Sequence, residues 1–377
     1  MIKRLLENNI EGTLLEGKTI ILYGARQVGK TTLVQNILNN YGKIGRYLNC
    51  EIISVEQNLT KAEPEKLKAF LGDYKLIVLD EAQNLQNTGK ILKVITDSLK
   101  DIQIIATGSS SFDLANKTAE PMTGRVITHT LFPLSVLEIK NNSDWLTVDA
   151  QLEKLLIFGS YPEIYTSNEE KAIKKLEELA SSYLFKDLLQ FKGIKKSSLL
   201  KNLLIALALQ LGNEVTHNEL ASKFGVSSLT IQKYLDLLEQ SFVIFKLNSF
   251  SRNIRKELTK AFKIYFYDNG IRNALINNFN AIPLRNDIGA LWENFCISER
   301  IKANSYNNRN VNSYFWRTYD QKEIDYIEET SGEIIGYEMK YSEKQKLKVP
   351  KGFKETYNAE VYKIDKSNYW KFFELLV

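Results

Sequence analysis

The chain has 377 residues, of which 44% are hydrophobic and 25% charged, and this composition is typical of a globular protein. The abundance of apolar and aromatic residues excludes disorder as the main state, and 19 glycines with 6 prolines exclude a collagen-like chain. The 50 Lys and Arg exceed the 45 Asp and Glu by a net charge of +5, which permits contact with nucleic acid without arguing for it.

The cysteines and the N-terminal residues point to a reducing compartment. Cys50 and Cys296 lie far apart in the sequence and do not form a disulfide framework. With 2 His in the chain, a zinc module of several Cys and His is also excluded. The N-terminus lacks the apolar core of a signal peptide, and the most apolar stretch, 203–211, is too short to span a membrane. We therefore expect a cytoplasmic protein.

The first third of the chain alternates between two patterns. Apolar runs at 19–23, 76–79 and 102–106 are typical of buried strands, and helical patterns follow them, the first beginning near Lys30. This alternation predicts an α/β fold with a parallel sheet that helices cover on both faces.

The rest of the chain changes character after Pro133. Amphipathic helical stretches run from 149 to 211, and a helix–turn–helix pattern follows at 216–239. A strand-like tail occupies 242–267, and mixed α and β patterns return from 287 to 377. We expect a helical region followed by a small α/β domain.

A phosphate-binding loop is predicted at 24–31, where Gly-Ala-Arg-Gln-Val-Gly-Lys-Thr fits the pattern G-x-x-x-x-G-K-[ST] between an apolar strand and a helix. The glycines allow the backbone to approach phosphate closely, and the helix N-terminus attracts the anion. We expect Lys30 to reach the β and γ phosphates of ATP and the Thr31 hydroxyl to bind Mg²⁺. The alternative, a chance Gly-Lys turn at a helix start, does not explain this context. The expected nucleotide-binding residues are Gly24, Ala25, Arg26, Gln27, Val28, Gly29, Lys30, Thr31, Thr32, Asp80 and Ser109.

Two acids follow the second apolar run. We expect Asp80 to hold Mg²⁺, usually through water, and Glu81 to polarise the attacking water. The alternative is that both acids only cap the next helix.

Two further polar positions are candidates near the nucleotide. Ser109 follows the third strand and is a candidate sensor of the γ phosphate, although a Ser-rich turn explains it equally well. Arg125 precedes another apolar strand and is a candidate to stabilise charge on the transferred phosphoryl group, in cis or from a neighbouring subunit. A surface arginine is the alternative.

Taken together, these motifs resemble those of a prokaryotic family of AAA+-like ATPases. They are Gly-Ala-Arg-Gln-Val-Gly-Lys-Thr-Thr at 24–32, Leu-Asp-Glu-Ala-Gln at 79–83, Thr-Gly-Ser-Ser at 107–110, Gly-Arg at 124–125, Leu-Phe-Pro-Leu-Ser at 131–135, Gly-Ser-Tyr-Pro at 159–162 and Tyr-Leu-Phe-Lys-Asp-Leu at 183–188. The resemblance implies an ATP-binding AAA+ core, a winged-helix segment, and a C-terminal domain of unknown function similar to the PD-(D/E)xK nuclease fold. The expected division is an ATPase core at 1–140, a helical lid or linker region at 141–198, a winged helix at 199–268 and the nuclease-like domain at 269–377.

The helix–turn–helix pattern is a candidate DNA-binding unit. Thr216 and Glu219 form a capping box, and Gly225 supplies the turn. Gln232 and Lys233 are among the exposed candidates on the second helix, which carries no arginine to read guanine. A structural lid or a protein-binding module is the alternative.

A second polar constellation lies near the C-terminus. A hairpin at 315–327 and a strand at 333–340 are expected to bring Asp325, Glu338 and Lys340 together. In nucleases of the resembling class the acids, here Asp325 and Glu338, bind a divalent metal, and Lys340 activates water. The resemblance adds Glu293 as a fourth catalytic group. A degenerate fold with a surface salt-bridge cluster is the alternative.

The sequence therefore predicts a Mg²⁺-dependent ATPase that acts as a nucleotide-driven switch and moves the winged helix relative to the C-terminal domain. One alternative is an ATP-gated, metal-dependent nuclease. Another is a non-catalytic nucleotide-binding regulator that contacts DNA or a protein partner. No membrane partner is expected.

Overall fold

The structure is a computed structural model that describes residues 2–61, 63–109, 122–183, 197–250, 261–318 and 322–376. Ser110 and residues 184–188 of the motifs quoted above lie outside these ranges. The contacts divide the chain into two compact units, residues 1–133 with 240–242 and residues 134–239 with 243–377. Each unit is described by itself.

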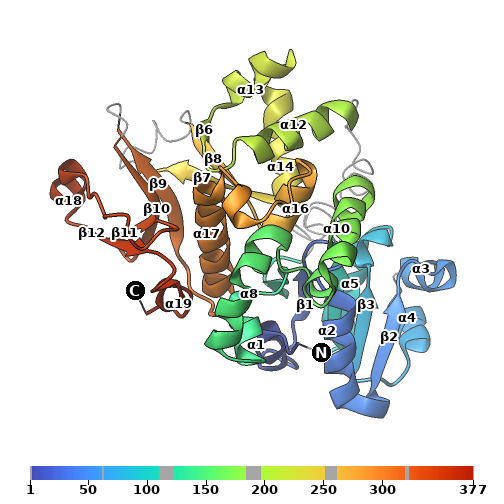
Figure 1. Cartoon of the computed structure of the whole chain (residues 1–377). Coiled ribbons are helices and arrows are strands. Elements are labelled where there is room, and N and C mark those ends of the chain that lie inside the picture. The colour runs from blue at the N-terminus through green and yellow to red at the C-terminus, as the bar shows by residue number, and fades with distance from the viewer. Residues whose placement is uncertain are drawn as a thin grey trace. The chain divides into compact units, whose positions relative to one another are not determined.

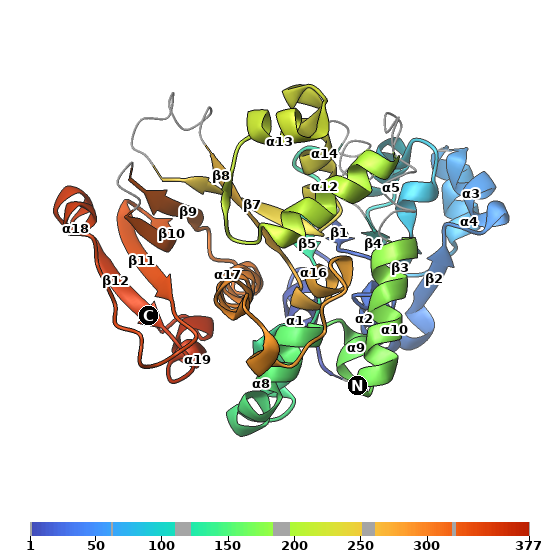
Figure 2. The ribbon, with the colours of Figure 1, turned by 45° about the horizontal axis from the view of Figure 1, so that its top comes forward.

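In the described part of the first unit, five parallel strands form a sheet in the order β2-β3-β4-β1-β5, which Figure 2 shows side by side. The strands are β1 (Thr19–Tyr23), β2 (Gly45–Asn49), β3 (Leu76–Asp80), β4 (Gln103–Gly108) and β5 (Val126–Thr130). Every residue of β1, β3 and β4 is buried, which explains their continuous apolar runs. In β2 only Leu48 is fully buried, so the sequence pattern did not reveal this strand.

One helix precedes the first strand of this unit, and the others lie between its strands in the sequence. They are α1 (Leu5–Glu11), α2 (Lys30–Tyr41), α3 (Ile53–Thr60), α4 (Pro64–Leu71) and α5 (Thr88–Ser98), with short 3-10 turns at Gly42–Ile44 and Ala82–Asn84. The predicted α/β class with a parallel sheet and flanking helices is confirmed.

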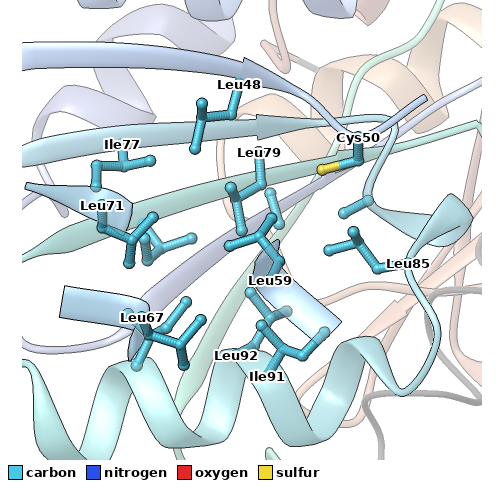
Figure 3. Packing of buried hydrophobic residues seen from close by; sticks show 14 of the residues in the cluster. Leu48, Cys50, Leu59, Leu67, Leu71, Ile77, Leu79, Leu85, Ile91 and Leu92 are labelled. Carbon is cyan, nitrogen blue, oxygen red and sulfur yellow. The ribbon is translucent and has the colours of Figure 1, made fainter. Parts of the chain in front are cut away.

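The core of the first unit lies where α3, α4 and α5 pack on the sheet (Figure 3). Leu59, Leu67 and Leu92 are fully buried there against Ile77 and Leu79 of β3. Burying each such side chain contributes about 1.5–3 kcal/mol. This packing fixes β3, so the acids at its carboxyl end have a rigid support.

Helices dominate the first half of the second unit. They are α7 (Val136–Asn141), α8 (Trp145–Phe158), α9 (Pro162–Tyr165), α10 (Glu169–Glu178), a π-helical turn at Leu179–Tyr183, α12 (Ser197–Leu209), α13 (His217–Phe224) and α14 (Ser228–Gln240). The side chain of Thr216 accepts a hydrogen bond from the Glu219 amide at the start of α13, and Gly225 ends this helix in a left-handed conformation.

The described part of the second unit contains a seven-stranded sheet in the order β12-β11-β10-β9-β7-β8-β6. Its strands are β6 (Glu214–Val215), β7 (Ile244–Ser249), β8 (Phe262–Phe266), β9 (Asn312–Arg317), β10 (Glu323–Thr330), β11 (Glu333–Met339) and β12 (Glu360–Ile364). The remaining helices are α16 (Asn269–Leu275), a 3-10 turn at Ile282–Leu284, α17 (Ile288–Tyr306), α18 (Lys351–Tyr357) and α19 (Tyr369–Phe373). The long helix α17 packs against β8 and β11, as Figure 1 illustrates.

This sheet crosses one of the expected domain boundaries. Strands β6, β7 and β8 precede residue 269 and the others follow it, and β7 pairs with β9 in parallel at Asn248–Tyr314 and Ser249–Phe315. The first compact unit ends at Pro133, ahead of the expected end of the ATPase core at residue 140. The division into four parts stays a prediction.

None of the described helices is both long enough and apolar enough to cross a bilayer.

Candidate nucleotide-binding site and carboxylate cluster

The predicted phosphate loop joins β1 to α2, and its shape depends on two glycines. Gly24 has φ +155°, and a Cβ there would lie 2.3 Å from the Leu131 carbonyl oxygen. Gly29 has φ +98° and is the N-cap residue of α2. Side chains rarely adopt this conformation, and the space beside Gly24 admits none. Both glycines are therefore required by the fold of the loop.

Lys30 begins α2, and its side chain folds back over the loop. The ammonium donates hydrogen bonds of 2.9 Å to the carbonyl oxygens of Gly24 and Ala25, and the residue is 6% exposed. The charge therefore lies at the mouth of the loop beside the α2 N-terminus, where both favour an anion. Among the other predicted loop residues, Ala25 and Val28 are buried, while Gln27 and Thr32 are exposed.

Asp80 is the last residue of β3 and accepts hydrogen bonds from several hydroxyl groups. Thr31 Oγ1 donates to Asp80 Oδ2 at 2.8 Å, the Tyr47 hydroxyl donates to the same oxygen, and Thr107 donates to Oδ1. Burial and the hydrogen bond to Asp80 raise the pKa of Tyr47, so its hydroxyl remains a donor. The sequence did not indicate Tyr47 as a site residue, because its strand β2 was not recognised.

Beside Asp80, Glu81 has the positive φ of +55°, which turns its side chain out of the line of the strand. Its amide donates to Thr107 Oγ1 at 3.0 Å, and its carboxylate accepts a hydrogen bond from Gln83. The same amide nitrogen of Gln83 donates to Ser109 Oγ at 3.2 Å. Glu81 and Ser109 are thus linked through Gln83 at the carboxyl ends of β3 and β4. Gln83 belongs to a quoted motif but was not predicted as a site residue.

Arg125 requires a correction. Its guanidinium pairs with Asp97 at 2.7 Å, and its carbonyl accepts a hydrogen bond of 2.9 Å from the Thr19 amide at the start of β1. Since β1 and β5 are parallel, Arg125 lies at the amino edge of the sheet, opposite the phosphate loop. The interpretation that it acts on the nucleotide in cis does not fit this position. A role from a neighbouring subunit stays a prediction.

In the second unit, Asp325, Glu338 and Lys340 come together as expected from the strand pattern. Asp325 lies on β10, Glu338 on β11, and Lys340 directly follows β11. The Lys340 ammonium is 3.3 Å from Asp325 Oδ2 and 2.6 Å from Glu338 Oε2. Burial, followed by repulsion from Asp325, raises the pKa of Glu338 to about 7.

Glu293 projects from α17 and has different direct partners. The Tyr265 hydroxyl donates to Glu293 Oε1 at 2.5 Å, and the Lys263 ammonium lies 3.2 Å from the same oxygen. Burial raises the pKa of Glu293 to about 7, and Asp325 adds to this shift while Lys263 opposes it. Lys263 is 2% exposed and also pairs with Glu323. The signal that sequence reasoning missed was a lysine within the apolar strand Phe262–Phe266.

A cavity of about 780 Å³ opens beside this carboxylate cluster, by which we mean Glu293, Asp325, Glu338, Lys263 and Lys340. Glu338 and Lys340 contribute to its wall. The other basic side chains of the wall are Lys322, Lys346, Lys348 and Lys351. The excess of lysines over carboxylates suits a polyanion.

Within the described ranges, no group of three or more His, Cys, Asp and Glu side chains is arranged to hold a metal ion by itself. Asp325 and Glu338 supply two carboxylates beside Lys340. For these two to hold a metal ion, water or substrate oxygens would have to complete its coordination.

Comparisons with known proteins match three stretches of the chain. Residues 16–140 match the family described as AAA domain, residues 149–281 match a domain of unknown function (DUF8612), and residues 288–369 match another (DUF4143). The uncharacterized protein Rv2008c of Mycobacterium tuberculosis is 28% identical over 326 residues, covering 85% of this chain and 70% of its own. The uncharacterized protein MJ1544 of Methanocaldococcus jannaschii is 26% identical over 348 residues, covering 86% of this chain and 75% of its own.

Among solved structures, the RuvB Holliday junction branch migration motor of Thermotoga maritima is 17% identical, with a TM-score of 0.32 over 65% of this chain and 90% of that chain. The AAA match covers the loop 24–31 and the acids at 80–81. Residues 16–140 are therefore similar to AAA domains.

Proposed function

We propose that the chain is a Mg²⁺-dependent ATPase whose nucleotide state acts as a switch on the second unit. The observation that carries this proposal is that Lys30, Thr31, Asp80 and Glu81 lie together at the carboxyl edge of the parallel sheet. In such sheets, this edge is where ligands bind.

Nucleotide binding would use groups that already face the loop. The Lys30 ammonium can exchange the carbonyls of Gly24 and Ala25 for phosphate oxygens, which are stronger acceptors because they are charged. The N-terminus of α2 adjoins the loop as well, and its helix dipole favours a bound phosphate.

The chemistry of Thr31 and Asp80 fits Mg²⁺. Their oxygens lie 2.8 Å apart, and Mg²⁺ prefers hydroxyl, carboxylate and water oxygens with few protein ligands. The Tyr47 hydroxyl donates to the same Asp80 oxygen and the Thr107 hydroxyl to the other, and both hold the carboxylate in place. Bound Mg²⁺ would neutralise charge on the phosphates.

Glu81 is the group proposed to polarise the attacking water. In this structure its carboxylate accepts a hydrogen bond from Gln83, which also bonds Ser109. Hydrolysis requires this carboxylate to accept a hydrogen bond from water instead, so Gln83 and Ser109 would set how readily Glu81 becomes available. This arrangement is compatible with slow, switch-like turnover.

The proposal is tested by nucleotide binding and turnover in single variants. Lys30→Ala should lose binding of Mg-ATP, while Glu81→Gln should bind Mg-ATP but hydrolyse it at a rate lower by about 10²–10⁴-fold. The exposed residues Lys43 and Glu65 supply the matched controls Lys43→Ala and Glu65→Gln, which should behave as the parent. Normal turnover in both site variants would refute the proposal.

Coupling to the second unit is tested with the Glu81→Gln variant, which should accumulate the ATP-bound state. Hydrogen exchange of residues 197–250 should differ between the ATP-bound and ADP-bound states. Identical exchange in both states would separate ATP hydrolysis from any switch role.

A second candidate function is favoured by the carboxylate cluster. Asp325 and Glu338 share Lys340 next to a lysine-lined cavity, which is an arrangement suited to metal-dependent hydrolysis of phosphodiesters. The two acids would hold a divalent cation, which supplies Lewis acidity, while Lys340 would position the attacking water.

This second function predicts cleavage of an oligonucleotide with Mg²⁺ or Mn²⁺ that is lost in Lys340→Ala. Lys246 is the matched control, because it also bridges two carboxylates, Asp236 at 3.0 Å and Glu239 at 2.8 Å.

A third outcome would support a regulator that contacts DNA through Gln232 and Lys233 of α14. In that case the protein would bind nucleotide without hydrolysing it, and it would bind DNA with salt-sensitive affinity without cleaving it.

A further inference from the structure

Arg4 lies immediately before α1 and contacts the phosphate loop from outside it. The residue is 6% exposed. Its Nη1 donates to the Val28 carbonyl oxygen and its Nη2 donates to the Phe132 carbonyl oxygen, each at 2.6 Å. One guanidinium therefore joins the centre of the loop to the segment that follows β5.

The bond to Val28 fixes one peptide plane of the loop. The Val28 carbonyl and the Gly29 amide belong to the same planar trans peptide, so they point in opposite directions. Because Arg4 holds the carbonyl, the Gly29 N–H is directed away from Arg4. Gly29 has the freest backbone of this stretch, at φ +98°, and its peptide is otherwise easily rotated.

The bond to Phe132 anchors the guanidinium to the edge of the sheet. The neighbouring Leu131 amide donates to the Tyr23 carbonyl at 2.7 Å, and the Leu131 carbonyl oxygen is the atom that excludes a side chain at Gly24. Arg4 therefore ties the loop to a segment that already contacts its first glycine. A lysine could not reproduce this, since its single ammonium lacks the planar pair of donor groups.

We propose that Arg4 is a positioning residue for nucleotide binding, which holds the Val28–Gly29 peptide so that the Gly29 N–H faces the phosphates. This inference rests on the proposed binding of ATP at the loop and adds a residue that lies outside the matched AAA region. Arg4 touches neither the nucleotide nor the reacting atoms, and it acts through the Val28 carbonyl.

The test measures Mg-ATP affinity, KM and kcat in Arg4→Ala and Arg4→Lys. Loss of a charged hydrogen bond should raise Kd and KM on the order of tenfold in both variants. The value of kcat should remain close to that of the parent, because the lost interaction is one of binding. Added guanidinium ion should restore affinity to Arg4→Ala, which a general loss of folding would not allow.

Arg46 provides the matched control. It also donates to two carbonyl oxygens, of Phe70 at 2.5 Å and Leu71 at 3.1 Å, but it lies near the amino end of β2, away from the loop. Arg46→Ala should leave Mg-ATP affinity unchanged, and thermal unfolding should show how far each variant is destabilised.

The outcomes separate the two proposals. If the parent protein does not bind Mg-ATP, the proposed function fails and this inference fails with it. If the parent and Arg46→Ala bind Mg-ATP and folded Arg4→Lys binds equally well, only the role of Arg4 is refuted. If Mg-ATP affinity falls equally in the Arg4 and Arg46 variants and guanidinium ion does not restore it, Arg4 only stabilises the fold. That result would overturn the inference.

Discussion

The Thr31 hydroxyl donates a hydrogen bond of 2.8 Å to the Asp80 carboxylate, and this bond connects the first turn of α2 to the end of β3 across 49 positions of the sequence. The two side chains that are expected to hold Mg²⁺ are thus positioned against each other in the protein itself.

Asp80→Asn should weaken the Mg²⁺ dependence of turnover while preserving the shape of the side chain. The amide lacks the negative charge that attracts the cation, so the Mg²⁺ concentration needed for half-maximal ATP hydrolysis should rise at least about tenfold. A Mg²⁺ titration of the ATPase rate measures this. Asp97→Asn, which removes an exposed acid paired with Arg125, should leave the titration unchanged. An unaltered titration for Asp80→Asn would remove Asp80 from the metal site.

Gly24→Ala should both destabilise the first unit and weaken nucleotide binding. The new Cβ would lie 2.3 Å from the Leu131 carbonyl oxygen at a φ of +155°, so the backbone has to shift. We expect a loss of about 2 kcal/mol or more in the free energy of unfolding, measured by chemical denaturation. Gly12→Ala is the control, because Gly12 has an ordinary helical conformation. If the two variants were equally stable, the conclusion that the loop requires glycine at position 24 would be wrong.

The stability of the second unit should fall as the pH rises from 5 to 8. The pKa values of Glu293 and Glu338 are both raised to about 7 from an ordinary value of 4.5, so the folded state binds more protons than the unfolded state in this range. Their stabilising contribution is complete below pH 4.5 and is lost as the pH passes 7. The loss should be on the order of 3 kcal/mol for each group, since one pKa unit corresponds to about 1.4 kcal/mol.

Urea denaturation at pH 5.5 and pH 8 measures this effect. Glu338→Gln should reduce the difference between the two pH values, because its amide does not titrate. Glu333→Gln supplies the control, since Glu333 is exposed on the same strand. A difference that persists unchanged in Glu338→Gln would show that other groups cause it.

Lys263→Met should destabilise the second unit more strongly than a surface lysine variant does. Lys263 is buried between Glu293 and Glu323, and its removal takes the ammonium from both carboxylates, leaving Glu323 with the Arg317 guanidinium at 3.7 Å. Removing one partner of a buried pair costs about 3–5 kcal/mol. The double variant Lys263→Met with Glu293→Gln should recover part of the lost free energy of unfolding. If it recovers none, Lys263 and Glu293 are not coupled.

Prediction from the sequence succeeded where a single physical requirement determines which residue type must occupy a given position. The loop 24–31 needs glycines at 24 and 29 because of close approach and positive φ, and the strand before Asp80 needs apolar residues on both faces. The strand pattern also placed Asp325 and Glu338 on neighbouring strands, because residues across an antiparallel pair lie side by side.

Contacts that depend on the order of the strands in the sheet could not be predicted from the sequence. Tyr47 reaches Asp80 because β2 lies beside β3, an order that a local pattern does not contain. Arg125 belongs to a quoted motif, yet the parallel pairing of β1 and β5 places it at the edge opposite the loop. Lys263 was overlooked because a charged residue within an apolar strand has meaning only once Glu293 is known to face it.

The parallel pairing of β7 with β9 limits how the second unit can respond to a nucleotide. The Phe250 amide donates to the Phe315 carbonyl oxygen at 2.6 Å, which continues this ladder beyond β7. Rotating the helix–turn–helix segment against the carboxylate cluster would break these main-chain bonds, at a cost of about 1 kcal/mol each. In the proposed switch, we therefore expect the helix–turn–helix segment and the carboxylate cluster to move together.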